Sequence, residues 1–201
     1  DKFLFQVKTM QEYWQGEAYI EFVRNVNRKI EIFTDISNYY TEMLPKEIIS
    51  KRNMYARKIN EVEDDVNLNK PVGLNKLIIK EQGNIIIYKS SAMEIKINRI
   101  EQIFDDIIRY LKEIQEDFNS IIWEGTLKIL MKQSFEEKMI IHKRIIKSTK
   151  QAFHDYLEKQ MREMDKAEKD NSFIEQHINL SDVNTKINIE SSSYDWEKNV
   201  F

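Results

Sequence analysis

Apolar residues recur at alternating steps of three and four through residues 91–122, with charged residues at most positions between them. A pattern of this kind places the apolar side chains on one side of an α-helix, in the a and d positions of a heptad repeat. We therefore predict a long helix over residues 91–122, N-capped by Ser90 or Ser91. Its apolar residues form a predicted interaction seam made of Ile97, Ile100, Phe104, Ile107, Leu111, Ile114, Phe118 and Ile121.

A looser apolar stripe runs from residue 126 to about residue 168. Its early steps are mostly of four residues, which drift around a helix, so this stripe is broader than a strict coiled-coil seam. We predict a second long helix here, antiparallel to the first and joined to it at Trp123-Glu124-Gly125. The stripe consists of Leu127, Met131, Phe135, Met139, Ile146, Phe153 and Tyr156.

The N-terminal third has the same helical periodicity, from Tyr19 to Met43. Pro45 interrupts it, because proline disfavours a helical conformation in the residue before it and suits the first turn of a new helix. We therefore expect one helix to end near Leu44 and another to cover residues 46–66, with Tyr55, Ile59, Val62 and Val66 among its apolar positions.

Two segments lack this helical pattern. Residues 67–90 contain a loop around Pro71 and Gly73, then two β-branched runs flanking Gly83-Asn84, which predict a small β-hairpin. The last part of the chain is polar, rich in Asn and Ser, and weakly patterned. The expected segments are a helical segment over 1–66, a loop and hairpin over 67–90, a long helical hairpin over 91–170, and an irregular tail over 171–201.

Composition supports an all-α fold: an elongated bundle of long antiparallel helices with one small β-hairpin. The chain has 201 residues, 32% of them charged, and only 4 Gly and 2 Pro, too few for many tight turns. The net charge of −3 disfavours a dedicated nucleic-acid-binding protein. Cysteine is absent, which excludes disulfides and thiolate chemistry. The chain has no initiating Met and stops in mid-pattern, which fits either a processed product or an excised piece of a larger protein.

Signatures of catalysis are nearly absent, so we expect no enzyme, no catalytic or metal-binding residue and no cofactor. His142 and His154 are too far apart on one helix to share a metal ion. His142 lies near the apolar stripe, where packing is the expected role and pH sensing the alternative. The densest basic cluster could meet an acidic partner, an anionic membrane or a phosphate backbone, although a solvated helix face is the simpler interpretation. It comprises Lys138, Lys143, Arg144, Lys147 and Lys150.

Two Trp-x-Gly triplets occur in a chain with only 3 Trp, at Trp14–Gly16 and at Trp123–Gly125. Together with Ala18 and Phe22, the first triplet resembles the signature of the WXG100 family. That resemblance implies helical hairpins with Trp-x-Gly at the bend, pairing into four-helix bundles, and export by type VII secretion systems. It implies that Trp14, Gly16, Trp123 and Gly125 are helix-bend residues.

Three functions fit these patterns. The favoured one is a non-enzymatic helical scaffold or protein-protein interaction segment of a larger assembly, of cytoskeletal, ciliary or motor-tail type. Its helical faces would bind protein partners, as a homo- or hetero-oligomer, in the cytoplasm or on the cytoskeleton. The second is a secreted WXG100-like effector or partner. The third is a membrane-acting helical protein, which the charged residues Lys80 and Glu81 of the expected hairpin disfavour.

Overall fold

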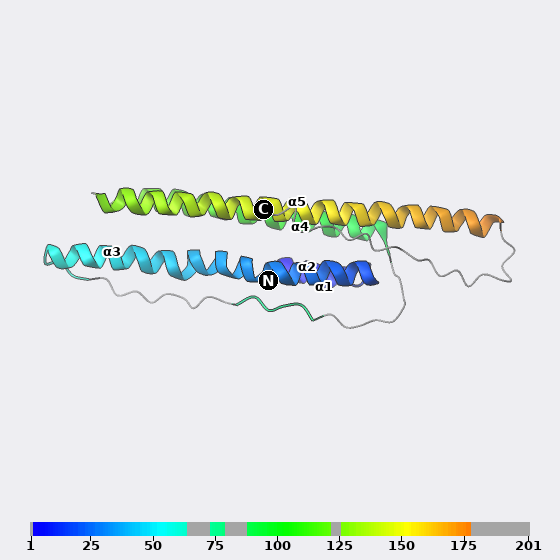
Figure 1. Cartoon of the computed structure of the whole chain (residues 1–201), viewed down its shortest axis with the longest axis horizontal. Coiled ribbons are helices and arrows are strands. Elements are labelled where there is room, and N and C mark those ends of the chain that lie inside the picture. Colours follow the sequence, from blue (N-terminus) through cyan, green and yellow to red (C-terminus); the bar gives the residue numbers. More distant parts are fainter. Residues whose placement is uncertain (1, 64–72, 79–87, 122–125, 178–201) are drawn as a thin grey trace. The chain divides into compact units, whose positions relative to one another are not determined.

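The computed structural model describes residues 2–63, 73–78, 88–121 and 126–177, and every regular element in these ranges is helical. The prediction of an all-α fold is therefore confirmed. The elements, coloured along the sequence in Figure 1, are α1 (Lys2–Met10), α2 (Glu17–Asn38), a π-helical turn (Tyr39–Met43), α3 (Leu44–Lys58), α4 (Ser90–Ser120) and α5 (Thr126–His177).

The expected β-hairpin falls mainly on residues 79–87, which lie outside the described residues, so it stays a prediction. Parts of its two arms are described. Leu77 and Ile78 lie in a short segment without regular structure, and Tyr88 forms an isolated antiparallel bridge with Trp14.

The chain divides into two compact units, each described here by itself. The first, called the hairpin unit, contains residues 1–21 and 80–201; the second, called the α2–α3 unit, contains residues 22–79. The sequence patterns placed residues 1–66 in one segment. The difference arises because α1 and the residues around Trp14 pack with α4 and α5, through contacts that no local pattern reveals.

Helices α4 and α5 form an antiparallel hairpin. Residues near the end of α4 contact residues near the start of α5, and earlier residues of α4 contact later residues of α5. The rings of Phe118 and Phe135 stack at 4.0 Å between centroids near the turn. Further along, Lys150 Nζ lies 2.7 Å from an Asp105 carboxylate oxygen. The N-cap of α4 is Lys89, not Ser90 or Ser91, and its backbone N–H donates to the carbonyl of Tyr13.

A triad of phenylalanine rings ties α1 to this hairpin. Phe3 of α1 lies 5.4 Å from Phe104 of α4 and 5.7 Å from Phe153 of α5, measured between ring centroids. Phe104 and Phe153 are 6.0 Å apart and both are 1% exposed. Edge-to-face and offset contacts at these distances add to the stabilisation from apolar burial. The core of the hairpin unit is therefore built from three helices.

The α2–α3 unit corrects the expectation of a break before Pro45. Leu44 is helical, with φ −61° and ψ −49°, and α3 begins at that residue. The π-helical turn explains this, because the Leu44 N–H bonds to the carbonyl of Tyr39, five residues back. A π turn inserts one extra residue, which changes the carbonyl register where proline lacks an N–H and would crowd the carbonyl four residues back.

Helix α3 ends at Lys58, well short of the predicted residue 66. Ile59 leaves the helical conformation and Asn60 adopts a positive φ of 55°, a left-handed conformation that ends helices. Val62, expected on the apolar face, is 88% exposed. Val66 lies outside the described residues. The apolar spacing past residue 58 therefore does not reflect a packed helix face.

Candidate interaction surfaces

The first Trp-x-Gly triplet forms the turn between α1 and α2. Trp14 is fully buried, and Gly16 has a φ of 118°, which L-residues with a side chain rarely adopt. The backbone N–H of Trp14 bonds to the carbonyl of Met10, at the end of α1, and α2 begins at Glu17. The backbone conformation at position 16 therefore favours glycine over any residue with a side chain.

Two tyrosines stabilise this turn through hydrogen bonds and ring contacts within the hairpin unit. The hydroxyl of Tyr156, on α5, donates a hydrogen bond to the carbonyl of Ala18, 2.9 Å away. The centroids of the Tyr156 and Trp14 rings are 6.4 Å apart. Tyr19 packs edge-on against Trp14 at 5.6 Å and donates to the Val7 carbonyl. Burial raises the pKa of Tyr19 to about 12 and raises that of Tyr156 as well. Both phenols therefore act as neutral donors in a packed turn.

A buried lysine joins α4 to α1. Lys96 is 8% exposed, and its ammonium group donates to Thr9 Oγ1 at 2.7 Å and lies 5.9 Å from the centre of the Tyr13 ring. Burial, followed by the nearby charge of Arg99, lowers its pKa. Lysine chemistry such as imine formation needs an accessible amine, and this one is enclosed by its own chain. We therefore assign Lys96 a packing role.

The interaction seam predicted from the heptad pattern lies in the interior of the hairpin unit. Ile97, Ile100, Phe104, Leu111 and Phe118 are buried, while Ile107, Ile114 and Ile121 are half-buried. The five buried side chains pack within the chain itself. A surface for a protein partner must therefore be sought elsewhere on these helices.

The opposite side of α5 carries four exposed apolar side chains, which we call the outer face: Ile129, Leu130, Ile140 and Ile141. They are 59%, 58%, 58% and 51% exposed. Two adjacent pairs eleven residues apart lie almost directly above one another, because eleven residues make nearly three helical turns. Sequence reasoning missed this face, although the eleven-residue spacing of Ile-Leu and Ile-Ile is visible in the sequence.

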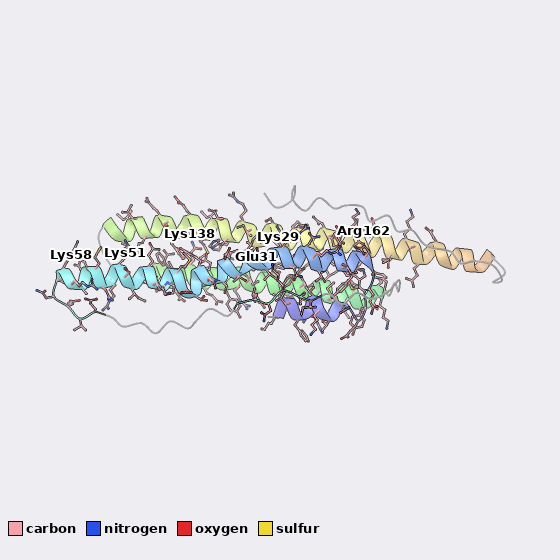
Figure 2. The ribbon with its side chains drawn as sticks, turned by 60° about the horizontal axis from the view of Figure 1, so that its bottom comes forward. Lys29, Glu31, Lys51, Lys58, Lys138 and Arg162 are labelled. Atoms are coloured by element: carbon pink, nitrogen blue, oxygen red, sulfur yellow. The ribbon has the colours of Figure 1, made fainter. Side chains whose placement is uncertain are left out.

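The predicted basic cluster is partly used inside the hairpin. Lys143 donates to Gln115 at 2.7 Å and Lys150 pairs with Asp105. Burial, then the neighbouring charges of Lys112 and Lys147, lowers the pKa of Lys143. Lys138, labelled in Figure 2, lies on α5. Arg144 and Lys147 are exposed, so the cationic surface is smaller than the sequence indicates.

The histidines form no metal centre among the described residues, where no group of three or more His, Cys, Asp or Glu side chains is suited to hold an ion. His154 contacts Glu101 through Nδ1, and its Nε2 lies 3.3 Å from Glu158. His142 is half-buried, and burial followed by the charge of Lys138 lowers its pKa. The contact between His154 and Glu101 links α5 to α4.

An open groove of about 490 Å³ lies between α1 and α4, lined by Phe5 and Ile103 together with Lys2, Arg99 and Asp106. Phe5 is 62% exposed. The charged and apolar lining of the groove is that of an ordinary helix–helix boundary.

Trp123 and Gly125, the other predicted bend residues, lie outside the described residues. Among the helices that the structure describes, none is both long and apolar enough to cross a membrane. No family model, no curated protein and no solved structure matches this chain.

Proposed function

We propose that the chain is a non-enzymatic helical scaffold segment, of the kind used in cytoskeletal, ciliary or motor-tail assemblies. The observation that carries this proposal is the outer face of α5. Its four large apolar side chains are exposed on a helix whose other side already has an apolar core. A second apolar face on one helix is typical of a helix that packs against another chain.

The occupant that fits this face is α5 of a second copy. In an antiparallel pair related by a two-fold axis, Ile129 and Leu130 of one copy meet Ile141 and Ile140 of the other. Glu137, between the two apolar pairs, then faces Gln133, so no like charges meet at the centre. A self-complementary patch of this kind is what a two-fold interface requires.

Light scattering over a range of concentrations tests this pairing. We expect the chain, 24.3 kDa as a monomer, to shift toward twice that mass as its concentration rises. Replacing one of the two apolar pairs in the variant Ile140→Glu/Ile141→Glu should keep it monomeric, because two charges would be desolvated in the interface. Ile95→Glu on α4 is the matched control, since Ile95 is 53% exposed and lies outside this face.

A monomer at every concentration would contradict the proposed pairing. So would association that the double variant leaves unchanged while circular dichroism shows that the helices are intact. Association lost equally in Ile95→Glu would indicate a nonspecific apolar effect, which also contradicts the assignment to the outer face.

A second candidate is a secreted WXG100-like partner. The helix–Trp-x-Gly–helix arrangement of α1, Trp14, Gly16 and α2 favours it, with the tryptophan buried and the glycine at positive φ. Genes for a type VII secretion ATPase beside the gene for this chain would support it. A parent chain of several thousand residues would contradict it.

A further inference from the structure

A single asparagine of α2 holds the main chain of a distant segment. Asn27 Nδ2 donates to the carbonyl of Leu77 at 2.9 Å, and the Leu77 backbone N–H donates to Asn27 Oδ1 at 2.8 Å. In an extended chain, the N–H and C=O of one residue point to the same side. The amide of Asn27 therefore pairs with Leu77 as a neighbouring strand would.

One turn along α2, a carboxylate binds the preceding side chain of that segment. Glu31, labelled on α2 in Figure 2, lies 2.7 Å from the ammonium group of Lys76. Residues four apart lie on the same side of a helix. Because Lys76 meets Glu31 and Leu77 meets Asn27, residues 73–78 run antiparallel to α2.

The two contacts differ in what they recognise. The pair of hydrogen bonds to the main chain accepts any residue with a free N–H, whereas Glu31 requires a cation one position earlier. Leu77 is half-buried, which favours an apolar residue there. Main-chain bonds for affinity and side-chain contacts for specificity are the usual features of a site that binds an extended peptide.

Most residues of the segment that now occupies this site are exposed. Gly73, Asn75 and Lys76 are exposed, and Ile78 is 92% exposed. Segments that bury little apolar surface open at a low free-energy cost. The site can therefore be vacated without loss of a helix.

We propose that the surface of α2 around Asn27 and Glu31 binds an extended segment of a partner protein that carries Lys or Arg directly before an apolar residue. Residues 73–78 occupy this surface in the free chain and are displaced when the partner binds. This site lies in the α2–α3 unit and does not depend on the pairing proposed for α5.

A capped peptide with the sequence of residues 73–78, Gly-Leu-Asn-Lys-Leu-Ile, tests the proposal. The receptor is the full chain carrying Leu77→Pro, which removes the N–H bound by Asn27 and so vacates the site. We expect saturable NMR shifts of the backbone amides of α2 around position 27 as peptide is added. Binding to the unmodified chain should be about tenfold weaker or more, because its own segment competes at a high effective concentration.

Two matched controls assign the contacts. Adding Asn27→Ala to the Leu77→Pro chain should abolish binding, as should methylating the peptide nitrogen that corresponds to Leu77. A peptide with Glu in place of its lysine should bind more weakly to the intact site. Circular dichroism of the Leu77→Pro chain should match the unmodified chain, because residue 77 lies in no helix.

Should Leu77→Pro perturb folding, Lys76→Glu vacates the same site by placing two carboxylates together. Absence of peptide binding to either folded variant would overturn the proposal. Binding that survives Asn27→Ala would overturn the assigned site. Equal affinity for the unmodified chain and the vacated variant would show that residues 73–78 do not occupy the peptide surface, which would also overturn it.

Discussion

The hairpin unit and the α2–α3 unit show similar apolar periodicity along their sequences, yet different contacts hold them. In the hairpin unit, aromatic rings from three helices meet in one core, and Tyr156 bonds across to the Trp14 turn. Within residues 22–79, α2 continues through a π-helical turn into α3, and the bonds from Asn27 and Glu31 hold residues 73–78. Helical periodicity thus predicts a helix, but the residues that pack against the helix decide how much its apolar stripe contributes to stability.

The largest expected difference between the units concerns their aromatic side chains. Phe104→Ala should lower the free energy of unfolding by about 3–5 kcal/mol, because Phe104 is 1% exposed between Phe3 and Phe153. Tyr55→Ala on α3 should change it by less than about 0.5 kcal/mol, because Tyr55 is 60% exposed. Urea denaturation measures both. Equal losses would mean that the aromatic triad is not a distinctive core.

The two glycines with described surroundings should differ next. Gly16→Ala should cost about 1–3 kcal/mol, because a φ of 118° strains any residue with a Cβ. Gly73→Ala should be neutral or slightly stabilising, since a Cβ at that position meets no atom within 4 Å. Thermal denaturation of the two variants compares them. A Gly16→Ala variant as stable as the parent would argue against a rigid Trp14 turn.

A half-buried histidine, His142, makes the hairpin unit sensitive to acid. Burial first, and Lys138 second, lowers the pKa of His142 from 6.5, so the unfolded chain binds the proton more readily. Its contribution to stability is complete above about pH 6.5 and falls as the pH drops toward the folded pKa. Melting temperatures of the parent and His142→Gln between about pH 8 and about pH 5 should converge on acidification. Parallel curves would contradict this role.

The smallest effect belongs to an exposed contact of the α2–α3 unit. The hydrogen bond from Lys76, followed by its charge, holds the pKa of Glu31 below 4.5. The contact is therefore present above the ordinary glutamate pKa and is lost as the pH falls through the lowered value. NMR titration of Glu31 should show the depressed pKa in the parent and its return to the ordinary range in Lys76→Ala. The same midpoint in both chains would mean that the pair does not form.

Local sequence predicted α4 well, but it ended the second long helix too early, because α5 runs to His177 rather than to about residue 168. α4 spans Ser90–Ser120, within two residues of the predicted bounds, because an unbroken heptad pattern leaves little ambiguity. The prediction failed at Pro45, where a π-helical turn lets the helix continue. It also assigned the heptad seam to partner binding, since periodicity alone does not distinguish an internal partner from an external one.

The contacts of the candidate sites were beyond local sequence reasoning. The hydroxyl of Tyr156 bonds to the carbonyl of Ala18, and Asn27 bonds to Leu77 fifty residues away. Such pairings depend on how distant segments pack, and no short motif encodes them. The outer face of α5 was different, because its paired apolar residues recur at a regular spacing that could have been read directly.

Cysteine cross-linking tests the proposed pairing of α5 most directly, because the chain contains no cysteine of its own. The variants Ile129→Cys and Ile141→Cys, mixed and oxidised, should form a covalent dimer, since these positions face each other in the antiparallel pair. Each variant alone should not cross-link through a two-fold pair, because its two cysteines would lie about 18 Å apart, far beyond disulfide reach. Cross-linking of Ile129→Cys alone, or none in the mixture, would contradict the pairing.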